Sequence, residues 1–370
     1  MIEKYYSGVI EQIYNRIGKE TRNIVMANYS NDFSIENLEV IRRYQSNEDN
    51  VFFAYSEFSY NTLVGAYEPF LDIICNMHRR FIGGSFDDFQ KECGVYYLHR
   101  QVLNSYYETG ECFREETVLL NEVAYEQRRM TKAIVDMLKR LSEVRPLMIV
   151  INRFQMASKS SIETIKYLID NPCTNIGIVL GVNVQVKGTD STVEVWDRIV
   201  ESLEDRSAIY YIGSAGQQKN HIRDTSDDEL YITTNFEQSI QEASNIMEFL
   251  DYEQAKRGCR IIEHKIKFED AWIDEKSLRR FYFIYARTSV LLGEMSKAIE
   301  LTNEYKALIP ESDSEHYFSL YYFMKGTLWT LWPAAMARLT PPGNLTRPCW
   351  SSRPPLRLSL LRPKWIWPPS

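Results

Sequence analysis

The sequence predicts an α/β protein with a parallel sheet, followed by an all-helical region. Short apolar runs of strand length alternate with amphipathic helix patterns between residues 23 and 235. The run at 147–151 is aliphatic throughout, which is typical of a parallel strand that is buried on both faces. Strand patterns stop near residue 236, and helix patterns alone continue beyond it.

Each predicted element has its own local pattern. Residues 1–18 predict a helix, because Val9, Ile10, Ile13 and Ile17 fall on one face. The predicted strands follow at 23–27, 51–58, 147–151, 175–183 and 207–213. The further predicted helices lie at 34–45, with Ser34 as the expected N-cap, at 70–81, 88–108 and 114–142, around 162–169, and at 193–203.

Residues 236–328 are predicted to be helical, with the spacing of tetratricopeptide repeats. Small residues stand where paired helices would touch, a glycine stands at the turn, and a proline closes the unit: Tyr282, Ala286, Gly293, Ala298 and Pro310. A second, incomplete unit is expected at 316–328. An ordinary helical hairpin shares much of this pattern, so both interpretations remain open. A repeat would offer a concave surface for protein or peptide partners.

Charge and composition argue against several classes of partner. A net charge of −7 gives no electrostatic support to binding of nucleic acid or of an anionic membrane. No apolar run approaches the ~20 residues that a membrane helix needs. The six cysteines have no framework spacing, which indicates reduced thiols. We therefore expect a cytoplasmic protein without nucleic-acid or membrane partners.

The composition changes abruptly in residues 329–370. This segment contains nine of the 13 prolines, five of the seven tryptophans and six Lys or Arg, and no Asp or Glu follows Glu315. Pro-Pro pairs there forbid long helices and central strands. One interpretation is a basic interaction tail. We favour another, translation in a shifted frame, which predicts that the native C-terminal continuation is missing.

Three segments carry a resemblance to a known family. The segment "FFAYSEFSYNTLVGAYEPFLDII" has a strand followed by an aromatic-x-Pro motif, "LMIVINRFQMASKSSIETIKYLI" a strand, loop and helix, and "IGIVLGVN" a further strand. In this order they resemble the ATPase module of signal-transduction NTPases with numerous domains, an AAA-like phosphate-loop class that helical repeats follow directly. The resemblance covers about two thirds of the chain, and it implies a polar sensor residue at Asn183.

The residues that such an ATPase needs are missing at their expected places. A phosphate loop requires glycines for close backbone approach, a lysine, and a Ser or Thr for Mg²⁺. The resemblance places Asn152 and Arg153 where an acidic pair would hold that metal. It places the phosphate-loop positions at Asn28, Phe33, Ser34 and Ile35. We therefore expect a degenerate site, with no catalytic residue, cofactor or metal.

Three other patterns give weaker indications of sites. Gly83-Gly84 is superficially similar to the turn of a GGDEF cyclase, but the acidic residue that must follow is absent. Gly18-Lys19 lacks the upstream glycine of a phosphate loop and is better explained as a helix-ending glycine. A spacing that could bind zinc occurs at Cys75, His78, Cys93 and His99. Packing in the core and at the surface explains these four residues better.

The combination of a degenerate ATPase module with helical repeats resembles the N-terminal regulatory half of certain bacterial multidomain GGDEF diguanylate cyclases. It implies a non-catalytic regulatory or scaffold portion of a bacterial signalling protein, once linked to a cyclase output domain. Two alternatives remain. One is an active ATP-binding ATPase of the same class with an unconventional phosphate site. The other is a transcriptional regulator with the same front half.

Overall fold

The computed structural model divides the chain into two units, residues 1–328 and residues 329–370. Everything that it describes lies in the first unit. The described residues are 2–29, 38–46, 50–58, 63–114, 118, 122–183, 209–211, 236–268 and 273–309.

Strands and helices alternate through the first part of the described chain, and helices alone follow. The strands are β1 (Ile24–Tyr29), β2 (Phe52–Glu57), β3 (Leu147–Asn152), β4 (Ile176–Asn183) and β5 (Ile209–Tyr211). The first helices are α1 (Ile2–Arg16), α2 (Glu39–Ser46), α3 (Phe70–Met77), the π-helical η1 (His78–Ile82), α4 (Phe86–Glu92), α5 (Tyr97–Thr109), α6 (Val123–Val144), the 3-10 turn η2 (Phe154–Met156) and α7 (Lys159–Asp170). The last are α9 (Phe236–Glu248), α10 (Tyr252–Phe268), α11 (Glu275–Leu291) and α12 (Met295–Ala307).

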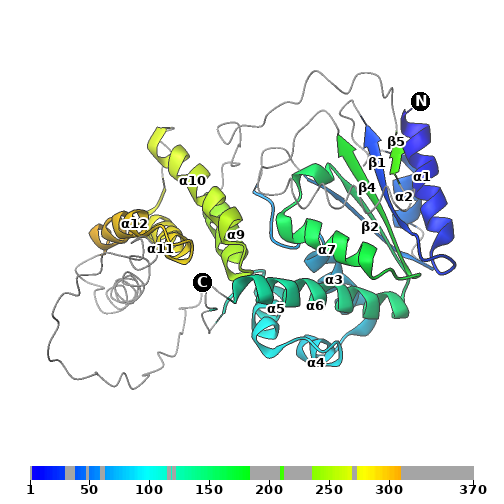
Figure 1. Cartoon of the computed structure of the whole chain (residues 1–370), viewed down its shortest axis with the longest axis horizontal. Coiled ribbons are helices and arrows are strands. Elements are labelled where there is room, and N and C mark those ends of the chain that lie inside the picture. Colours follow the sequence, from blue (N-terminus) through cyan, green and yellow to red (C-terminus); the bar gives the residue numbers. More distant parts are fainter. Residues whose placement is uncertain are drawn as a thin grey trace, which may run out of the picture. The chain divides into compact units, whose positions relative to one another are not determined.

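The predicted parallel sheet is confirmed. Its strands lie in the order β2-β3-β4-β1-β5 and pair in parallel (Figure 1). From β1 the chain passes to the far edge at β2, returns through β3 to β4, and then crosses β1 to reach β5. The connections after β1 and β4 therefore leave in opposite directions. In open α/β sheets, ligands bind at the carboxyl ends of strands at such a switch point.

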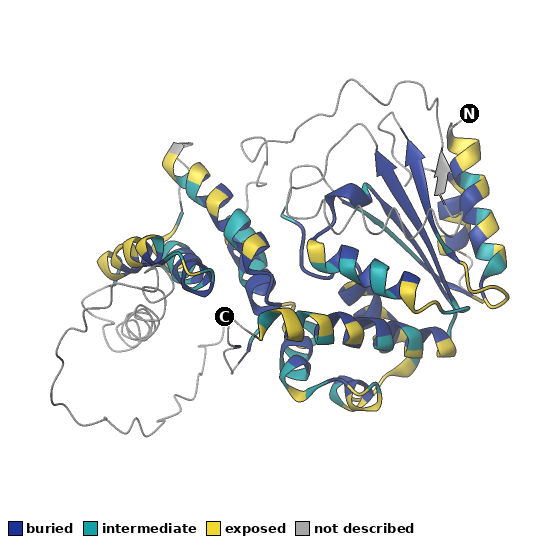
Figure 2. Ribbon diagram, viewed as in Figure 1, coloured by how far each residue is buried: buried dark blue, intermediate teal, exposed yellow. Residues whose placement is uncertain are grey.

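Alternate residues of strands β1 to β4 face two separate cores. Val150 and Val179 belong to the cluster that α1 and α2 cover, whereas Ile149 and Ile178 belong to the cluster formed with α3, α6 and α7. Every residue of β3 and β4 is buried (Figure 2). The aliphatic composition of these strands follows from this burial on both sides, because neither face meets water.

The described residues from 236 to 309 form helices, as predicted for this part of the chain. Helices α11 and α12 form the most extensive helix pair, in which Ala286 and Ala298 are fully buried. Gly293 lies in the turn between them with φ 77°, a conformation that glycine adopts without steric cost. Tyr282 is partly buried against the core. These contacts fit a repeat unit or an ordinary hairpin equally well, and Pro310 lies outside the described residues.

Helices α9 and α10 are joined to the sheet-bearing part by hydrogen bonds to polar groups near their connection. The backbone N–H of Cys112 donates to Asn245 Oδ1 at 2.8 Å. Gln127 Nε2 donates to the carbonyl oxygen of Leu250 at 2.7 Å. Arg114 donates to the carbonyl oxygen of Glu248 at 3.1 Å. The helical region therefore begins as a packed extension of the α/β layer.

Several predicted boundaries were wrong. The helix expected over 88–108 is two helices, because Gly94 turns the backbone with φ 69° between α4 and α5. Helix α2 begins at Glu39, after the non-helical Leu38, and Ser34, the expected N-cap, lies outside the described residues. Helix α6 begins at Val123 rather than near residue 114. The helix expected over 193–203 lies outside the described residues.

Gly177 in β4 allows α1 to lie close against the sheet. A Cβ atom added at this position would lie 2.8 Å from Ile17 Cδ1 and 3.0 Å from Ile13 Cγ2. Gly8, by contrast, lies on the exposed side of α1, where an added Cβ meets nothing within 4 Å. The same substitution should therefore have opposite effects at these two glycines.

We predict that Gly177→Ala lowers the free energy of unfolding by about 1–2 kcal/mol, because the new methyl group overpacks the contact with α1. Gly8→Ala should raise it by about 0.5–1 kcal/mol, because alanine stabilises an exposed helix position. Urea unfolding of both variants measures the two changes. Equal changes of the same sign would contradict the close packing of α1 on β4.

Candidate functional site

The positions predicted for a nucleotide site fall along the carboxyl edge of the sheet. Asn152 is the last residue of β3 and Asn183 the last of β4. Asn28 was expected in a loop after the first strand, but it lies within β1, in register with Val182 of β4. Because β4 pairs with both β1 and β3, these three positions come together at one edge. Phe33, Ser34 and Ile35 lie outside the described residues.

Asn152 is fully buried, and its side-chain oxygen is held by two donors. The hydroxyl of Tyr29 donates to Asn152 Oδ1 at 2.8 Å, and the backbone N–H of Arg153 donates to the same atom at 3.0 Å. An acidic residue here could turn a charged oxygen toward a metal. The amide of Asn152 instead uses its oxygen to tie β1 to β3, which is a structural role.

Arg153 forms an ion pair with the carboxylate that lies nearest on the neighbouring strand. Its guanidinium is 3.0 Å from Glu57 Oε1, and each side chain is about one-fifth exposed. Glu57 also accepts a hydrogen bond from the hydroxyl of Tyr55. Mg²⁺ needs carboxylate oxygens, but here a built-in cation neutralises the carboxylate. These residues therefore do not fit the metal of a phosphate-loop ATPase.

Tyr6 of α1 lies fully buried beside this ion pair and its neighbours. Burial raises the pKa of Tyr6 well above its usual value, and the nearby Tyr29, Tyr55 and Glu57 raise it further. The phenol therefore stays protonated and uncharged. Alternation along the strands places Glu57 and Asn152 on the face that α1 covers. On that face, side chains of the chain itself fill the space next to the expected metal position.

The rest of the edge is polar but carries amides. The backbone N–H of Asn183 donates to Gln155 Oε1 at 3.2 Å. Asn28 Oδ1, Asn152 Nδ2 and Gln155 Nε2 are buried, and none of them has a hydrogen-bond partner among the residues that the structure describes. Buried polar groups without a partner are uncommon, so these three atoms mark the edge as polar. They belong to neutral amides and therefore bring no charge to the edge.

The described residues contain no group of three or more His, Cys, Asp or Glu that could hold a metal ion. Of the weaker zinc candidates, His78 packs edge-on against Phe86 and Tyr107. Burial lowers the pKa of His99 to about 3, with Arg114 and Arg129 acting in the same direction, so this imidazole is neutral. His78 Nδ1 also lies 3.1 Å from the hydroxyl of Tyr107, and His99 Nε2 lies 3.0 Å from Glu126 Oε2, so both histidines have partners within the protein.

Sequence reasoning missed Glu57, Tyr29 and Tyr6. Glu57 is the second-last residue of the predicted strand "VFFAYSEF" and ends β2, and Tyr29 ends β1, so a search for polar residues near every strand end would have found both. The ion pair between Glu57 and Arg153 could not be inferred locally, because it needs the pairing of β2 with β3. Tyr6 gave no signal, since it continues the apolar face of α1.

Comparison of this chain with known protein families and with curated proteins found no match. In the described part of the chain, none of the helices combines the length and the apolar character that crossing a membrane requires. The site is therefore defined by the residues and geometry of this chain alone.

Glu242 of α9 has a carboxyl group with a shifted pKa, and it lies where α9 packs on the α/β layer. Burial raises the pKa of Glu242 to about 7, and the nearby Glu68 and Asp72 contribute. Burial also raises the pKa of Glu68, although the N–H of Gly65 donates to its carboxylate at 2.9 Å. Glu242 therefore holds a proton more tightly in the folded chain than in the unfolded one.

The pairing of Arg153 with Glu57 gives a prediction that a double-mutant cycle tests. Arg153→Met, Glu57→Gln and the double variant should give a coupling energy of about 1–2 kcal/mol, because both groups are largely shielded from water. The matched control is Arg140 with Glu143, at 2.8 Å but with side chains 51% and 60% exposed. That pair should couple by less than about 0.5 kcal/mol.

Equal coupling energies for the two pairs would show that the Arg153–Glu57 pair is an ordinary surface contact. Chemical unfolding of the single and double variants supplies both values. The cycle cancels the loss of packing in each single variant, so it isolates the interaction between the charges.

We predict that Glu242→Gln stabilises the protein at neutral to basic pH. Because the folded pKa of Glu242 is raised, its contribution to stability is lost as pH rises from about 4.5 to about 7. Glutamine stays neutral, so the variant should gain on the order of 2 kcal/mol over the wild type near about pH 8 and almost nothing near about pH 4. Urea unfolding as a function of pH measures the difference, and a pH-independent difference would contradict it.

Proposed function

We propose that this chain is the non-catalytic regulatory or scaffold portion of a bacterial cytoplasmic signalling protein. In this proposal, the α/β layer is a degenerate ATPase module that has lost nucleotide hydrolysis. The helices that follow it bind a protein or peptide partner, and the output belongs to a diguanylate cyclase domain.

The observation that carries the proposal is the ion pair at the carboxyl edge. A hydrolysing site needs an unpaired acidic group there to position Mg²⁺ and water. At this edge Arg153 neutralises Glu57, and the side-chain oxygen of Asn152 is bound by Tyr29 and by the backbone. To bind a metal here, the protein would have to break the ion pair of Arg153 with Glu57. The free energy of metal binding would have to offset the cost of breaking that pair.

The strand order supports the part of the proposal that derives the layer from an ATPase module. The strand that resembles the sensor strand, β4, lies between the two strands at which nucleotide-binding residues would stand, β1 and β3. The expected positions Asn28, Asn152 and Asn183 therefore end at one edge, at the switch point of the sheet. A shared edge is the arrangement that a nucleotide site requires.

The helical region supports the role in partner binding. Ala286 and Ala298 permit close contact between α11 and α12, and Gly293 forms the turn, as in a helical repeat. Repeats of this kind present side chains from successive helices on one surface. The link to a cyclase output domain rests on the sequence resemblance.

The proposal predicts that the full chain does not bind ATP in a magnesium-dependent manner. Isothermal titration of the protein with ATP, once with Mg²⁺ and once with a chelator, should give no difference in heat between the two titrations. An intact phosphate-loop ATPase measured alongside serves as the positive control. Micromolar binding that requires Mg²⁺ would contradict the proposal and favour an active ATPase with an unconventional phosphate site.

A further inference from the structure

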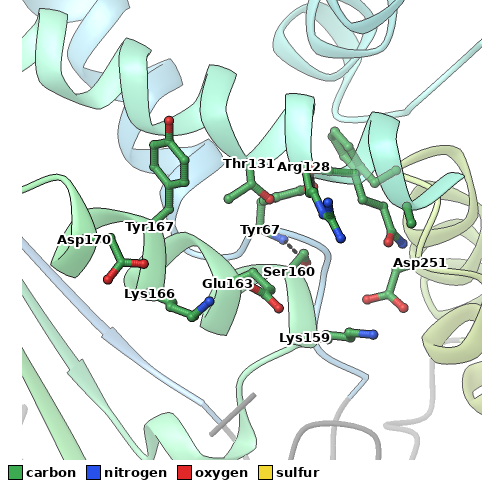
Figure 3. A pocket seen from close by; sticks show the side chains of 13 residues that line it. Tyr67, Arg128, Thr131, Lys159, Ser160, Glu163, Lys166, Tyr167, Asp170 and Asp251 are labelled. Carbon is green, nitrogen blue, oxygen red and sulfur yellow. Dashed lines mark hydrogen bonds between the residues drawn. The ribbon is translucent and has the colours of Figure 1, made fainter. Parts of the chain in front are cut away.

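A cavity of about 360 Å³ lies between α6, α7 and the connection from α9 to α10, and none of its lining residues belongs to the carboxyl-edge site (Figure 3). Its size is within the range of small-molecule pockets. Three basic and three acidic residues line it, together with aromatic side chains. The charged residues are Arg128, Lys159, Lys166, Glu163, Asp170 and Asp251.

Asp251 is the buried acidic residue of the cavity, and the fold uses only one of its two side-chain oxygens. It precedes α10, and its Oδ1 accepts a hydrogen bond from the backbone N–H of Gln254 at 3.4 Å, which is the role of an N-cap. Its Oδ2 is buried and has no hydrogen-bond partner among the described residues. The residue is only 7% exposed. Capping explains one oxygen, and the other is left unpaired at the cavity.

Burial of the Asp251 side chain disfavours its charged form. Burial raises the pKa of this carboxyl, while the hydrogen bond from Gln254 and the charge of Lys159 oppose the rise. A neutral Asn, Ser or Thr could cap the helix without burying a charge. A cation brought to Oδ2 would offset the cost of burial.

Two basic side chains extend into the same space as Asp251 (Figure 3). Lys159 lies in the first turn of α7, and Arg128 lies in α6. Neither of the two has a hydrogen bond or ion pair within the described parts of the chain. The cavity thus offers a buried carboxylate and two cations that form no hydrogen bond or ion pair with it, although the charge of Lys159 acts on Asp251.

The aromatic part of the cavity wall, formed by Tyr67 and Phe249, is held in place by backbone and ring contacts. Tyr67 adopts a left-handed backbone conformation with φ 60°, and its N–H donates to Ser160 Oγ at 2.9 Å. The ring of Tyr67 meets that of Phe249 edge to face, with centroids 5.6 Å apart. Leu250, directly before Asp251, has φ 70°. Strained backbone of this kind is found where the surroundings hold a site in place.

The balance of charge selects the class of ligand. A phosphate-bearing ligand would meet the repulsion of Asp251 and Glu163, and a simple cation would meet that of Lys159 and Arg128. A small molecule with one positive and one negative group satisfies both sides. The aromatic faces of Tyr67 and Phe249 suit an ammonium group or an apolar side chain.

We propose that this cavity binds a free α-amino acid, with its ammonium group at Asp251 and its carboxylate between Lys159 and Arg128. The side chain of the ligand would lie against Tyr67 and Phe249. This assignment goes beyond the regulatory role proposed above and does not depend on it, because the cavity shares no residue with the carboxyl edge.

Isothermal titration of the full chain tests the proposal with three sets of probes. The first is the common amino acids, the second their decarboxylated amines, and the third the matching acids without the amino group. At least one amino acid should bind, and its amine and its acid should each bind about tenfold more weakly or not at all, because each lacks one charge-assisted contact.

Asp251→Asn is the central variant, because it keeps the capping oxygen and the volume while removing the charge. It should weaken amino-acid binding by about tenfold or more. Asp274→Asn is the matched control, since Asp274 caps α11 by accepting from the N–H of Ser277 at 3.0 Å and does not line the cavity. This control should bind like the wild type.

Lys159→Gln provides a second route, because Lys159 is exposed and its substitution does not endanger folding. It should weaken binding of the amino acid but not of the amine. The proposal is overturned if no amino acid binds, or if Asp251→Asn and Lys159→Gln both bind it as tightly as the wild type. Preferential binding of an amine, or of an acid, overturns the zwitterion assignment in the same way.

Discussion

Burial of both faces of the parallel sheet is the constraint on which the rest of the structure depends. All residues of strands β3 and β4 are buried, so each strand needs a helical layer on either side. Helices α1 and α2 supply one layer, and the cluster with α3, α6 and α7 supplies the other. Polar side chains can then appear only where the strands end.

This constraint explains the nature of the carboxyl edge. Glu57, Asn152 and Asn183 are the last residues of their strands, and in β3 and β4 the asparagine is the first polar residue after an apolar run. Because α1 reaches over this edge and buries Tyr6 there, a bare carboxylate would be poorly solvated. Arg153 compensates by pairing with Glu57. A site that is covered in this way favours fixed internal contacts over an exchangeable metal and water.

The sequence predicted those features that arise from local patterns. The aliphatic run at 147–151 identified β3, and the apolar face of residues 1–18 identified α1. Local patterns failed where one residue changes the backbone direction. Gly94 divides the predicted helix 88–108, although an isolated glycine is tolerated inside many helices. Leu250 has φ 70°, and nothing in its residue type indicates that the chain turns there.

The candidate site was predictable in its positions but not in its interactions. Asn152, Arg153 and Asn183 were placed correctly at strand ends, because their places follow from the strands themselves. The partner of Arg153 was not predictable, since it depends on which strands lie side by side. The cavity at Asp251 was equally hidden, because its lining comes from segments that lie far apart in the chain and meet only after folding.

The connection between α9 and α10 gives the cavity a physical link to the helical region. Gln127 holds the carbonyl of Leu250, and Arg114 holds that of Glu248, so the backbone beside Asp251 is fixed to the α/β layer. A ligand at Asp251 and Lys159 would add a contact across the same junction, between α10 and α7. Its binding free energy would then favour the arrangement in which the two regions are docked. By thermodynamic reciprocity, a partner that binds the helices and prefers that docked arrangement would raise the affinity of the cavity for its ligand.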